Sequence, residues 1–255
     1  WYCEGQLDHY GVDRTHVKRV RGEYRTSLAV YETRIEEHQS VIYRNNAADF
    51  QMDTDDIEAI DFAAYGAVLT AGTVFAAEPS RSAAFRAFEK AKAAGLPLLF
   101  DIDYRPYSWP SAEEAADVLT CAGDMADVIV GNDEEFGFMA GHIDKGLAKA
   151  CALAETSAEI VIYKMGPEGA ITFADGTETR TGIYLVEAVK PTGAGDSFMA
   201  GLLASLSDGC PLKEAVLRGS ACASHVVARP GCAPAMPDSD QLAAFLAAHP
   251  GPTAA

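Results

Sequence analysis

The segment best suited to chemistry is a run of small residues, Thr192, Gly193, Ala194 and Gly195, that ends in a carboxylate, Asp196. A turn of this kind exposes successive backbone N–H groups, and the helix predicted to follow adds a partial positive charge, so an anion binds there readily. Asp196 beside that anion is placed to take a proton from a hydroxyl group. The combination predicts phosphoryl transfer to an alcohol. The alternative is a glycine turn whose aspartate only stabilises the helix dipole.

The segments before this turn alternate between strands and helices. The predicted strands are 67–71, which we expect to be buried, then 98–103, 128–130, 160–164 and 170–173, the last two paired across a glycine-rich turn. The predicted helices are 80–94, one that starts after Ser111, and then 196–207, 211–227 and 238–248. This alternation indicates an α/β fold of three layers, with a doubly wound, mostly parallel sheet and helices on both faces. In such folds ligands bind at the carboxyl ends of the strands.

Shorter signals define three local features. Segments 26–35 and 40–44 are rich in β-forming residues and flank the polar turn 36–39, which predicts a hairpin. Asp53 has the position of a cap for a short helix. Ser111 and Glu114 have the spacing of a capping box, in which each side chain accepts the backbone N–H of the other residue.

Polar residues follow three of the predicted strands, where ligands are expected. They are Asp103 and Arg105 after the second strand, Asn132 and Glu135 after the third, and Lys164, Gly166 and Gly169 after the fourth. Each set has a structural alternative: a self-neutralising ion pair, a helix N-terminus and an ordinary turn, respectively. Because all three sets fall at strand ends ahead of the anion-binding turn, we favour a functional site.

Composition excludes several classes of protein. A net charge of −17 and a pI near 4.6 argue against nucleic acid or an anionic membrane as a partner, although they do not exclude a nucleotide site. The six cysteines contain no C-x-x-C pair, and no histidine spacing resembles a metal site, so neither a disulfide framework nor a zinc site is expected. With no membrane-length apolar run and no signal segment, a cytoplasmic protein is expected.

Taken in order, these motifs resemble those of the ribokinase-like (PfkB) family of carbohydrate kinases. The matching residues are Asp101, Asp103 and Arg105, then Asn132 and Glu135, then Gly166 and Gly169, and finally Gly193 to Asp196. The resemblance covers the whole chain and implies one ribokinase-like kinase domain over 1–255 with a small β lid at about 24–46. It also implies ATP and Mg²⁺ as cofactors, a sugar as the other substrate, and a homodimer that forms through the lid.

Four segments are similar to one group within the family, the 5-dehydro-2-deoxygluconokinases of inositol catabolism. They are 41–49, 101–109, 190–196 and 229–233. The similarity implies that the substrate is a sugar acid, 5-dehydro-2-deoxygluconate, phosphorylated on its 6-hydroxyl by ATP. The alternatives are a 2-dehydro-3-deoxygluconokinase, a fructokinase, or a nucleotide- or sugar-binding relative with weak catalysis.

The family resemblance also implies a role for individual residues. Asp196 would be the general base, and the N–H groups of Gly193, Ala194 and Gly195 would hold the transferred phosphoryl group. The residues expected at the nucleotide are Lys164, Gly166, Gly169, Thr192 and, at the adenine, Ser220. Asn132 and Glu135 would organise Mg²⁺ and its waters. Arg44, Asp103 and Arg105 would contact the acidic substrate.

Three features depart from the family pattern. Asp103 stands where many relatives have asparagine, so the sugar contact there accepts a hydrogen bond. Lys190 stands six residues before the base, where relatives that bind a monovalent cation have aspartate. We hypothesise that its ammonium group replaces that cation electrostatically. The family's first strand and its glycine pair find no counterpart in the chain, which begins Trp1, Tyr2, Cys3, so an N-terminally incomplete domain is expected.

Overall fold

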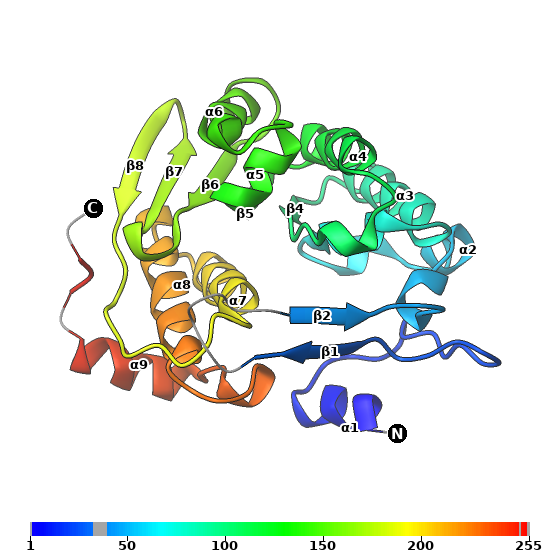
Figure 1. Cartoon of the computed structure of the whole chain (residues 1–255), viewed down its shortest axis with the longest axis horizontal. Helices are drawn as coiled ribbons and strands as arrows, with labels where there is room; N and C mark the ends of the chain where they lie inside the picture. Colours follow the sequence, from blue (N-terminus) through cyan, green and yellow to red (C-terminus); the bar gives the residue numbers. More distant parts are fainter. Residues whose placement is uncertain (1, 33–39, 250, 254–255) are drawn as a thin grey trace.

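A six-stranded sheet forms the centre of the computed structural model, which describes residues 2–32, 40–249 and 251–253. Its strand order is β3-β4-β5-β6-β7-β8. The strands are β3 (Val68–Ala71), β4 (Leu98–Asp101), β5 (Val128–Asn132), β6 (Ile160–Lys164), β7 (Ala170–Ala174) and β8 (Thr177–Thr181). The first four run parallel, whereas β7 and β8 are antiparallel to their neighbours. The mostly parallel sheet is as predicted, and β8 is a strand that the sequence analysis did not include (Figure 1).

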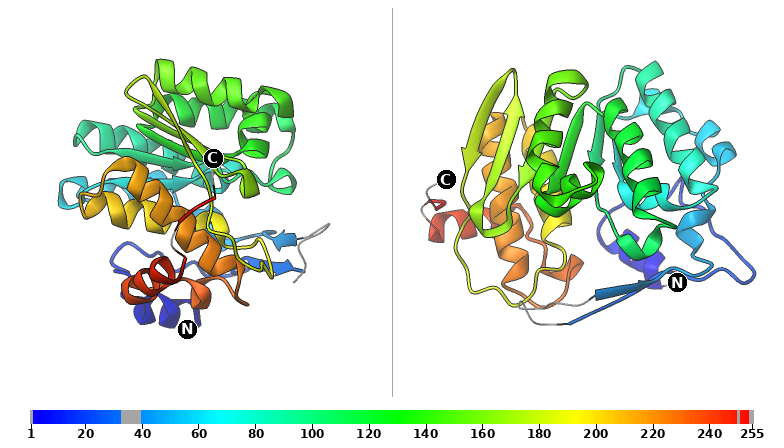
Figure 2. Two further views of the ribbon diagram at one scale, coloured as in Figure 1. Left: turned by 90° about the vertical axis from the view of Figure 1, so that its left-hand side faces the viewer. Right: turned by 45° about the horizontal axis from the view of Figure 1, so that its top comes forward.

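Helices cover both faces of this sheet, as Figure 2 shows. The helices are α1 (Tyr2–His9), α2 (Thr54–Glu58), α3 (Ser80–Ala93), α4 (Ala112–Met125), α5 (Asp133–Met139), α6 (Gly146–Thr156), α7 (Ala194–Ser207), α8 (Leu212–Val227) and α9 (Ser239–Ala248). Helices α3, α4 and α6 pack on one face, while α7 and α8 lie on the other, with α9 against α8. The three-layer α/β fold is therefore confirmed.

The pattern of buried residues along β4 explains the two layers. Leu98 and Phe100 point to the face covered by α3 and α4, and Leu99 between them points to the face covered by α7. Successive side chains of a strand point to opposite faces, so a strand buried on both sides reads as a continuous apolar run. This apolar run is what made β4 recognisable in the sequence.

The prediction that the strand at 67–71 is buried is wrong. Leu69 in β3 is 49% exposed, while Leu99, its register partner on β4, is 4% exposed. β3 is the edge strand of the described sheet and pairs only with β4. The apolar cluster built on α7 includes Leu99 and does not extend to Leu69. The apolar sequence therefore indicated a strand correctly but did not determine its place in the sheet.

The predicted hairpin is present as a separate two-stranded sheet, β1 (Leu28–Tyr31) with β2 (Ser40–Tyr43), shown apart from the main sheet in Figure 1. The strands pair antiparallel. β1 begins two residues after the start of the predicted segment 26–35, whose end at 33–35 lies outside the described residues, and β2 ends one residue before the end of the predicted segment 40–44. The predicted polar turn at 36–39 lies outside the described residues. A parallel bridge between Arg25 and Ala47 joins the two ends of the hairpin segment.

Of the two predicted helix caps, one is complete. The Asp53 side chain accepts the Asp56 N–H and the Asp56 side chain accepts the Asp53 N–H, which starts α2. At α4 the Ser111 hydroxyl accepts the Glu114 N–H at 3.1 Å, whereas the Glu114 carboxylate binds Arg81 at 2.6 Å. The reciprocal half of that capping box is thus replaced by an ion pair with α3. Within the described residues, no helix is both long and apolar enough to cross a membrane.

Candidate active site

The carboxyl ends of β4, β5 and β6 meet the N-terminus of α7. A Cβ atom added to Gly195 would lie 3.7 Å from the Lys164 Nζ at the end of β6. Besides burial, the charge of Asp196 raises the pKa of both Asp101, the last residue of β4, and Asp103, which follows that strand. Residues from four separate elements therefore gather at one edge of the sheet, where parallel α/β folds bind their ligands.

The turn before α7 is fixed by a glycine in the left-handed region. Gly193 has φ 87° and ψ −1°, and the Ala194 N–H donates to the Pro191 carbonyl at 3.2 Å. These values match the third position of a type II turn, which requires a positive φ and so favours glycine. A Cβ atom on Gly193 would also lie 3.3 Å from the Cys232 Cβ. Both the backbone conformation and the close neighbour explain why this residue is glycine.

The turn presents a different set of N–H groups from the predicted one. The Ala194 N–H is engaged by Pro191, so it does not face a ligand as predicted. Within the described chain, the N–H groups of Gly193, Gly195 and Asp196 make no hydrogen bond to the protein. The difference arises because Ala194, the first residue of α7, is also the fourth residue of the turn, and its N–H closes the turn on Pro191. Three donors still remain at the positive end of α7, which suits a phosphoryl group.

Two charged groups flank these donors. Asp196 is exposed in the first turn of α7. The Lys164 ammonium group lies 5.4 Å from the centre of the Phe198 ring, which is buried one turn further along α7. An ammonium group is attracted to the face of an aromatic ring, so Phe198 holds the Lys164 charge beside the turn.

Asp103 and Arg105 form an ion pair at the end of β4. The Arg105 guanidinium lies 2.6 Å from Asp103 Oδ1 and 3.6 Å from Glu135 Oε1, and it donates to the Tyr104 carbonyl at 2.9 Å. Asp103 has a positive φ of 34°, unusual for a residue other than glycine. Burial raises the pKa of Asp103 to about 6, and Asp101 and Asp196 add to the rise while Arg105 opposes it.

Asn132 and Glu135 form a capping box at the start of α5. Asn132 Oδ1 accepts the Glu135 N–H at 2.8 Å, and Glu135 Oε2 accepts the Asn132 N–H at 2.8 Å. Glu135 is buried, and burial raises its pKa to about 7, opposed by Lys164 and reinforced by Asp101. These two residues therefore do form a helix N-terminus, which was the structural alternative to a functional role. Their predicted metal role stays a proposal.

The family model for "pfkB family carbohydrate kinase" matches residues 2–239. This chain belongs to the PfkB family. It is therefore a carbohydrate kinase, a phosphotransferase of a family that uses ATP.

Individual relatives support this family assignment. The chain is 37% identical over 245 residues to the 5-dehydro-2-deoxygluconokinase of Geobacillus thermodenitrificans, covering 94% of this chain and 73% of the relative. The fructokinase of Vibrio cholerae in its fructose, ADP and calcium ion bound form superimposes with a TM-score of 0.84 at 26% identity, covering 96% of this chain and 80% of that one. A double mutant of the same fructokinase, in a fructose, ADP and potassium ion bound form, matches with the same TM-score and identity.

In this PfkB kinase the Arg44 side chain is held in place by three neighbouring residues. The Arg44 guanidinium binds the Asp49 carboxylate, lies 4.0 Å from the centre of the Phe50 ring and lies 3.4 Å from the Thr73 carbonyl oxygen. Arg44 and Arg105 both act on the Tyr107 hydroxyl, whose pKa is raised by burial and lowered by these two charges. The charges of the two predicted substrate arginines therefore both reach one tyrosine.

Of three predicted nucleotide residues, Gly169 and Ser220 are placed by packing and Gly166 is not. Gly169 has φ 89°, and a Cβ atom there would lie 2.0 Å from the Thr181 carbonyl oxygen, so glycine is required for β7 to approach β8. Gly166 has φ 54° and open space around its Cα. Ser220 is buried in α8, with its hydroxyl 3.5 Å from the Gly182 carbonyl oxygen. Only Gly166 of these three has open space around it for a ligand.

Two residues of the site were missed by the sequence analysis. Thr73 hydrogen-bonds the Asp103 side chain and accepts from Arg44, so it links the two predicted substrate contacts. Tyr107 is close enough to both Arg44 and Arg105 for their charges to oppose the rise of its pKa. Tyr107 was within the matched segment 101–109 and could have been singled out, whereas nothing in the local sequence marks Thr73.

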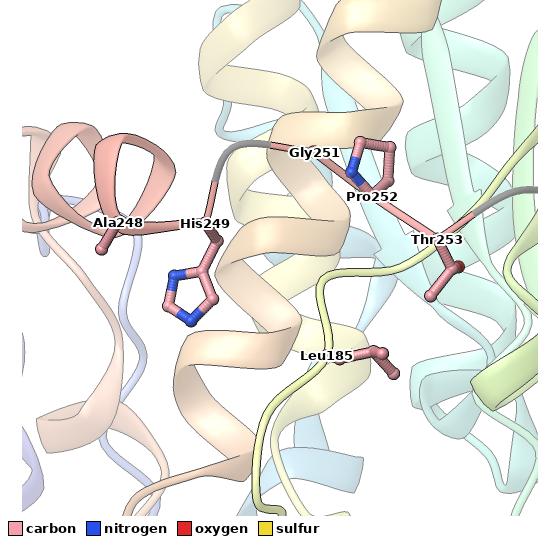
Figure 3. Close-up of a pocket in the computed structure, with 6 residues that line it drawn as sticks. All are labelled: Leu185, Ala248, His249, Gly251, Pro252 and Thr253. Atoms are coloured by element: carbon pink, nitrogen blue, oxygen red, sulfur yellow. The ribbon is translucent and has the colours of Figure 1, made fainter.

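A separate pocket lies at the C-terminal end of α9 (Figure 3). Its lining residues are Leu185, Ala248, His249, Gly251, Pro252 and Thr253. The His249 ring stacks on Phe245 at 4.0 Å and its Nδ1 lies 2.8 Å from the Phe245 carbonyl oxygen. None of these six described residues is a lysine, arginine, aspartate or glutamate, so they do not offer the groups that phosphate or a sugar acid needs.

Proposed function

We propose that this PfkB kinase transfers the γ-phosphoryl group of ATP to the 6-hydroxyl of 5-dehydro-2-deoxy-D-gluconate. The observation that carries the proposal is the meeting of the three unpaired N–H groups of the α7 turn with Asp196 at the carboxyl edge of the sheet. The 37% identity to a 5-dehydro-2-deoxygluconokinase supports the choice of sugar acid. We also propose that residues 1–255 all belong to one kinase domain and that the hairpin at about 24–46 is its lid.

In the proposed reaction Asp196 takes the proton of the sugar hydroxyl. The oxygen forms a bond to the γ-phosphorus, the bond between that phosphorus and the bridging oxygen breaks, and its electron pair stays on ADP. A carboxylate acts as a base best when it is ionised and open to the substrate, and Asp196 is exposed at the mouth of the turn.

The transferred group gathers negative charge on its oxygens, and the surrounding donors are set to stabilise it. The N–H groups of Gly193, Gly195 and Asp196 point from the positive end of α7. The Lys164 ammonium group adds a full positive charge next to Gly195. Because these donors are fixed before the substrate arrives, little reorganisation is needed during transfer.

A magnesium ion fits the charges of this site. Four carboxylates, Asp101, Asp103, Glu135 and Asp196, gather in the described part of the site beside the cations Lys164 and Arg105, and burial raises the pKa of the first three. ATP brings further negative charge, which a divalent cation would balance. Among the described residues no cluster of three metal-binding side chains exists. Mg²⁺ often binds through phosphates, water and one or two carboxylates, and it would supply charge neutralisation here.

Two arginines support the proposal that the substrate is acidic. The charges of Arg44 and Arg105 both reach Tyr107, and a guanidinium pairs well with a carboxylate. A fructokinase would bind a neutral sugar and would not need this pair of cations. A 2-dehydro-3-deoxygluconokinase binds a different sugar acid and remains the closest alternative in chemistry.

The decisive experiment compares phosphorylation of 5-dehydro-2-deoxygluconate, 2-dehydro-3-deoxygluconate and fructose with ATP and Mg²⁺. We expect the highest kcat/KM for the first compound. A preference for either other sugar would reject the proposed substrate but keep the sugar-kinase chemistry. Binding of ATP and Mg²⁺ with no turnover of any sugar would favour a binding protein instead. The turnover assay separates these last two results, and calorimetry with ATP and Mg²⁺ shows whether a protein without turnover still binds the nucleotide.

We also propose that the hairpin mediates a homodimer. Its paired residues Leu28 and Tyr43, and Val30 and Val41, lie on one face and are all exposed, between 39% and 59%. Exposed apolar side chains gathered on one sheet face are typical of protein contact surfaces. A second copy of the same hairpin offers a self-complementary surface.

A further inference from the structure

Lys190 is buried, and no carboxylate among the described residues pairs with it. Its side chain is 0% exposed, and in the described chain its ammonium group contacts two backbone carbonyl oxygens, of Thr192 at 2.5 Å and of Val226 at 3.4 Å. The Val189 and Lys190 N–H groups both donate to the Val227 carbonyl, at 2.7 Å and 3.2 Å. The lysine backbone is thus tied to the end of α8, and its side chain is directed at the turn before α7.

Burying the Lys190 ammonium group in this way costs free energy. Removing an ammonium group from water is costly, and two carbonyl oxygens compensate only in part. Burial accordingly lowers the pKa of Lys190, with the nearby Cys232 opposing that shift. A methionine or leucine of similar length would fill the same space without this penalty. The retained positive charge therefore points to an anion that binds close to the turn.

The contact with Thr192 also determines where the next N–H group points. The peptide bond is planar and trans, so the Thr192 carbonyl and the Gly193 N–H point in opposite directions. Lys190 holds the Thr192 carbonyl inward, toward the end of α8. The Gly193 N–H is one of the three donors left unpaired at the turn, and it is directed away from the lysine.

We propose that Lys190 is a positioning residue for phosphoryl transfer, a built-in cation that orients the Thr192–Gly193 peptide so that its N–H faces the transferred group. The inference rests on the proposed function and extends it to a residue that does not touch the substrate. The Thr192 and Val226 carbonyls would be equally suitable ligands for a small monovalent cation. The wild-type enzyme therefore needs no such ion, whereas an enzyme without the lysine ammonium does.

The first experiment measures turnover of the wild-type enzyme and of Lys190→Met at fixed ionic strength, with potassium, ammonium or tetramethylammonium as the only monovalent cation. We expect wild-type kcat to vary less than twofold among the salts. In tetramethylammonium, kcat of Lys190→Met should fall on the order of 100-fold, the effect of losing one donor to the transition state. Potassium or ammonium should restore at least tenfold. Lys213→Met, which removes an exposed lysine of α8, should behave as wild type.

Two results would overturn the proposal: a wild-type enzyme that loses most of its kcat without potassium, or a Lys190→Met enzyme with unchanged kcat in every salt. A second experiment needs no substrate and records melting temperatures in the same salts. Potassium should raise the melting temperature of Lys190→Met relative to tetramethylammonium and leave wild type unaffected. Equal melting temperatures of the variant in all salts would reject cation replacement. Because sugar and ATP are absent, this outcome is distinguishable from a failure of the proposed kinase function.

Discussion

Asn132 and Glu135 exchange hydrogen bonds, each side chain accepting the backbone N–H of the other at 2.8 Å. This pair joins the carboxyl end of β5 to the start of α5. The remaining Glu135 oxygen lies 3.6 Å from Arg105, so the cap also contacts the end of β4. The helix cap thereby helps to position the Arg105 guanidinium of the proposed site. It also contains the buried Glu135 carboxyl group, whose pKa is raised to about 7.

This raised pKa makes stability depend on pH. The folded protein keeps the Glu135 proton up to about pH 7, whereas the ordinary pKa is 4.5, so folding takes up a proton between these values. Stability due to Glu135 therefore falls as the pH rises from 5 to 8. In Glu135→Gln, which keeps a carbonyl acceptor for the Asn132 N–H, this fall should be absent. We expect the loss of unfolding free energy between pH 5 and pH 8 to shrink by about 2 kcal/mol.

Urea unfolding at a series of pH values measures this difference. Glu134→Gln alters the exposed neighbouring carboxylate and should keep the wild-type pH dependence. If Glu135→Gln and wild type lost the same stability between pH 5 and pH 8, the assignment of a raised pKa to Glu135 would be wrong.

The sequence was informative wherever the interaction is local. The Asp53 cap spans three residues and was read correctly, as were the hairpin strands and the helix after the anion-binding turn. Ser111 likewise starts α4, but Glu114 turns to Arg81, which is 33 positions away in the sequence. Competition from a distant partner is invisible to a pattern of four residues.

The long-range contacts of the site needed the structure for the same reason. The contact of Lys190 with Val226 spans 36 positions, and the link from Thr73 to Asp103 joins the ends of two strands. The sequence placed Ala194 in the anion-binding turn but could not show that its N–H closes the turn on Pro191. Motifs therefore identified which residues gather at the sheet edge, while hydrogen-bond partners and burial followed from tertiary packing.

The conformation of Gly193 gives a second prediction. Gly193→Ala should lose on the order of 100-fold in kcat, because a Cβ atom at φ 87° strains the turn and meets Cys232 at 3.3 Å, which displaces the N–H donor. Gly209→Ala is the matched control, since Gly209 has φ 77° at the other end of α7 but open space around it. Both variants should lose about 1 kcal/mol of stability from backbone strain. Only Gly193→Ala should lose turnover in a steady-state assay, and equal kcat values for the two variants would contradict a role for this turn.

The hairpin face gives a third prediction. Replacing Val30 and Val41 together by lysine places like charges directly opposite each other on the exposed face of β1 and β2. Sedimentation equilibrium should show a dimer for the wild-type protein and a monomer for the double variant. Val12→Lys changes another exposed valine, 47% accessible and outside the hairpin, and should leave the dimer intact. A wild-type protein that sediments as a monomer at every concentration would reject the dimer through the hairpin.

The fourth prediction concerns the base. Asp196→Asn keeps the size of the side chain but cannot take a proton, so kcat should fall by about 10³-fold, within the range for loss of a general base. ATP affinity should change less than threefold, because in the proposed reaction the side chain contacts the hydroxyl and not the nucleotide. Coupled assays of ADP release give kcat, and calorimetry gives the ATP dissociation constant. Asp208→Asn, at the exposed C-terminal end of α7, controls for the lost charge and should retain activity. An Asp196→Asn enzyme with near-normal kcat would show that another group accepts the proton.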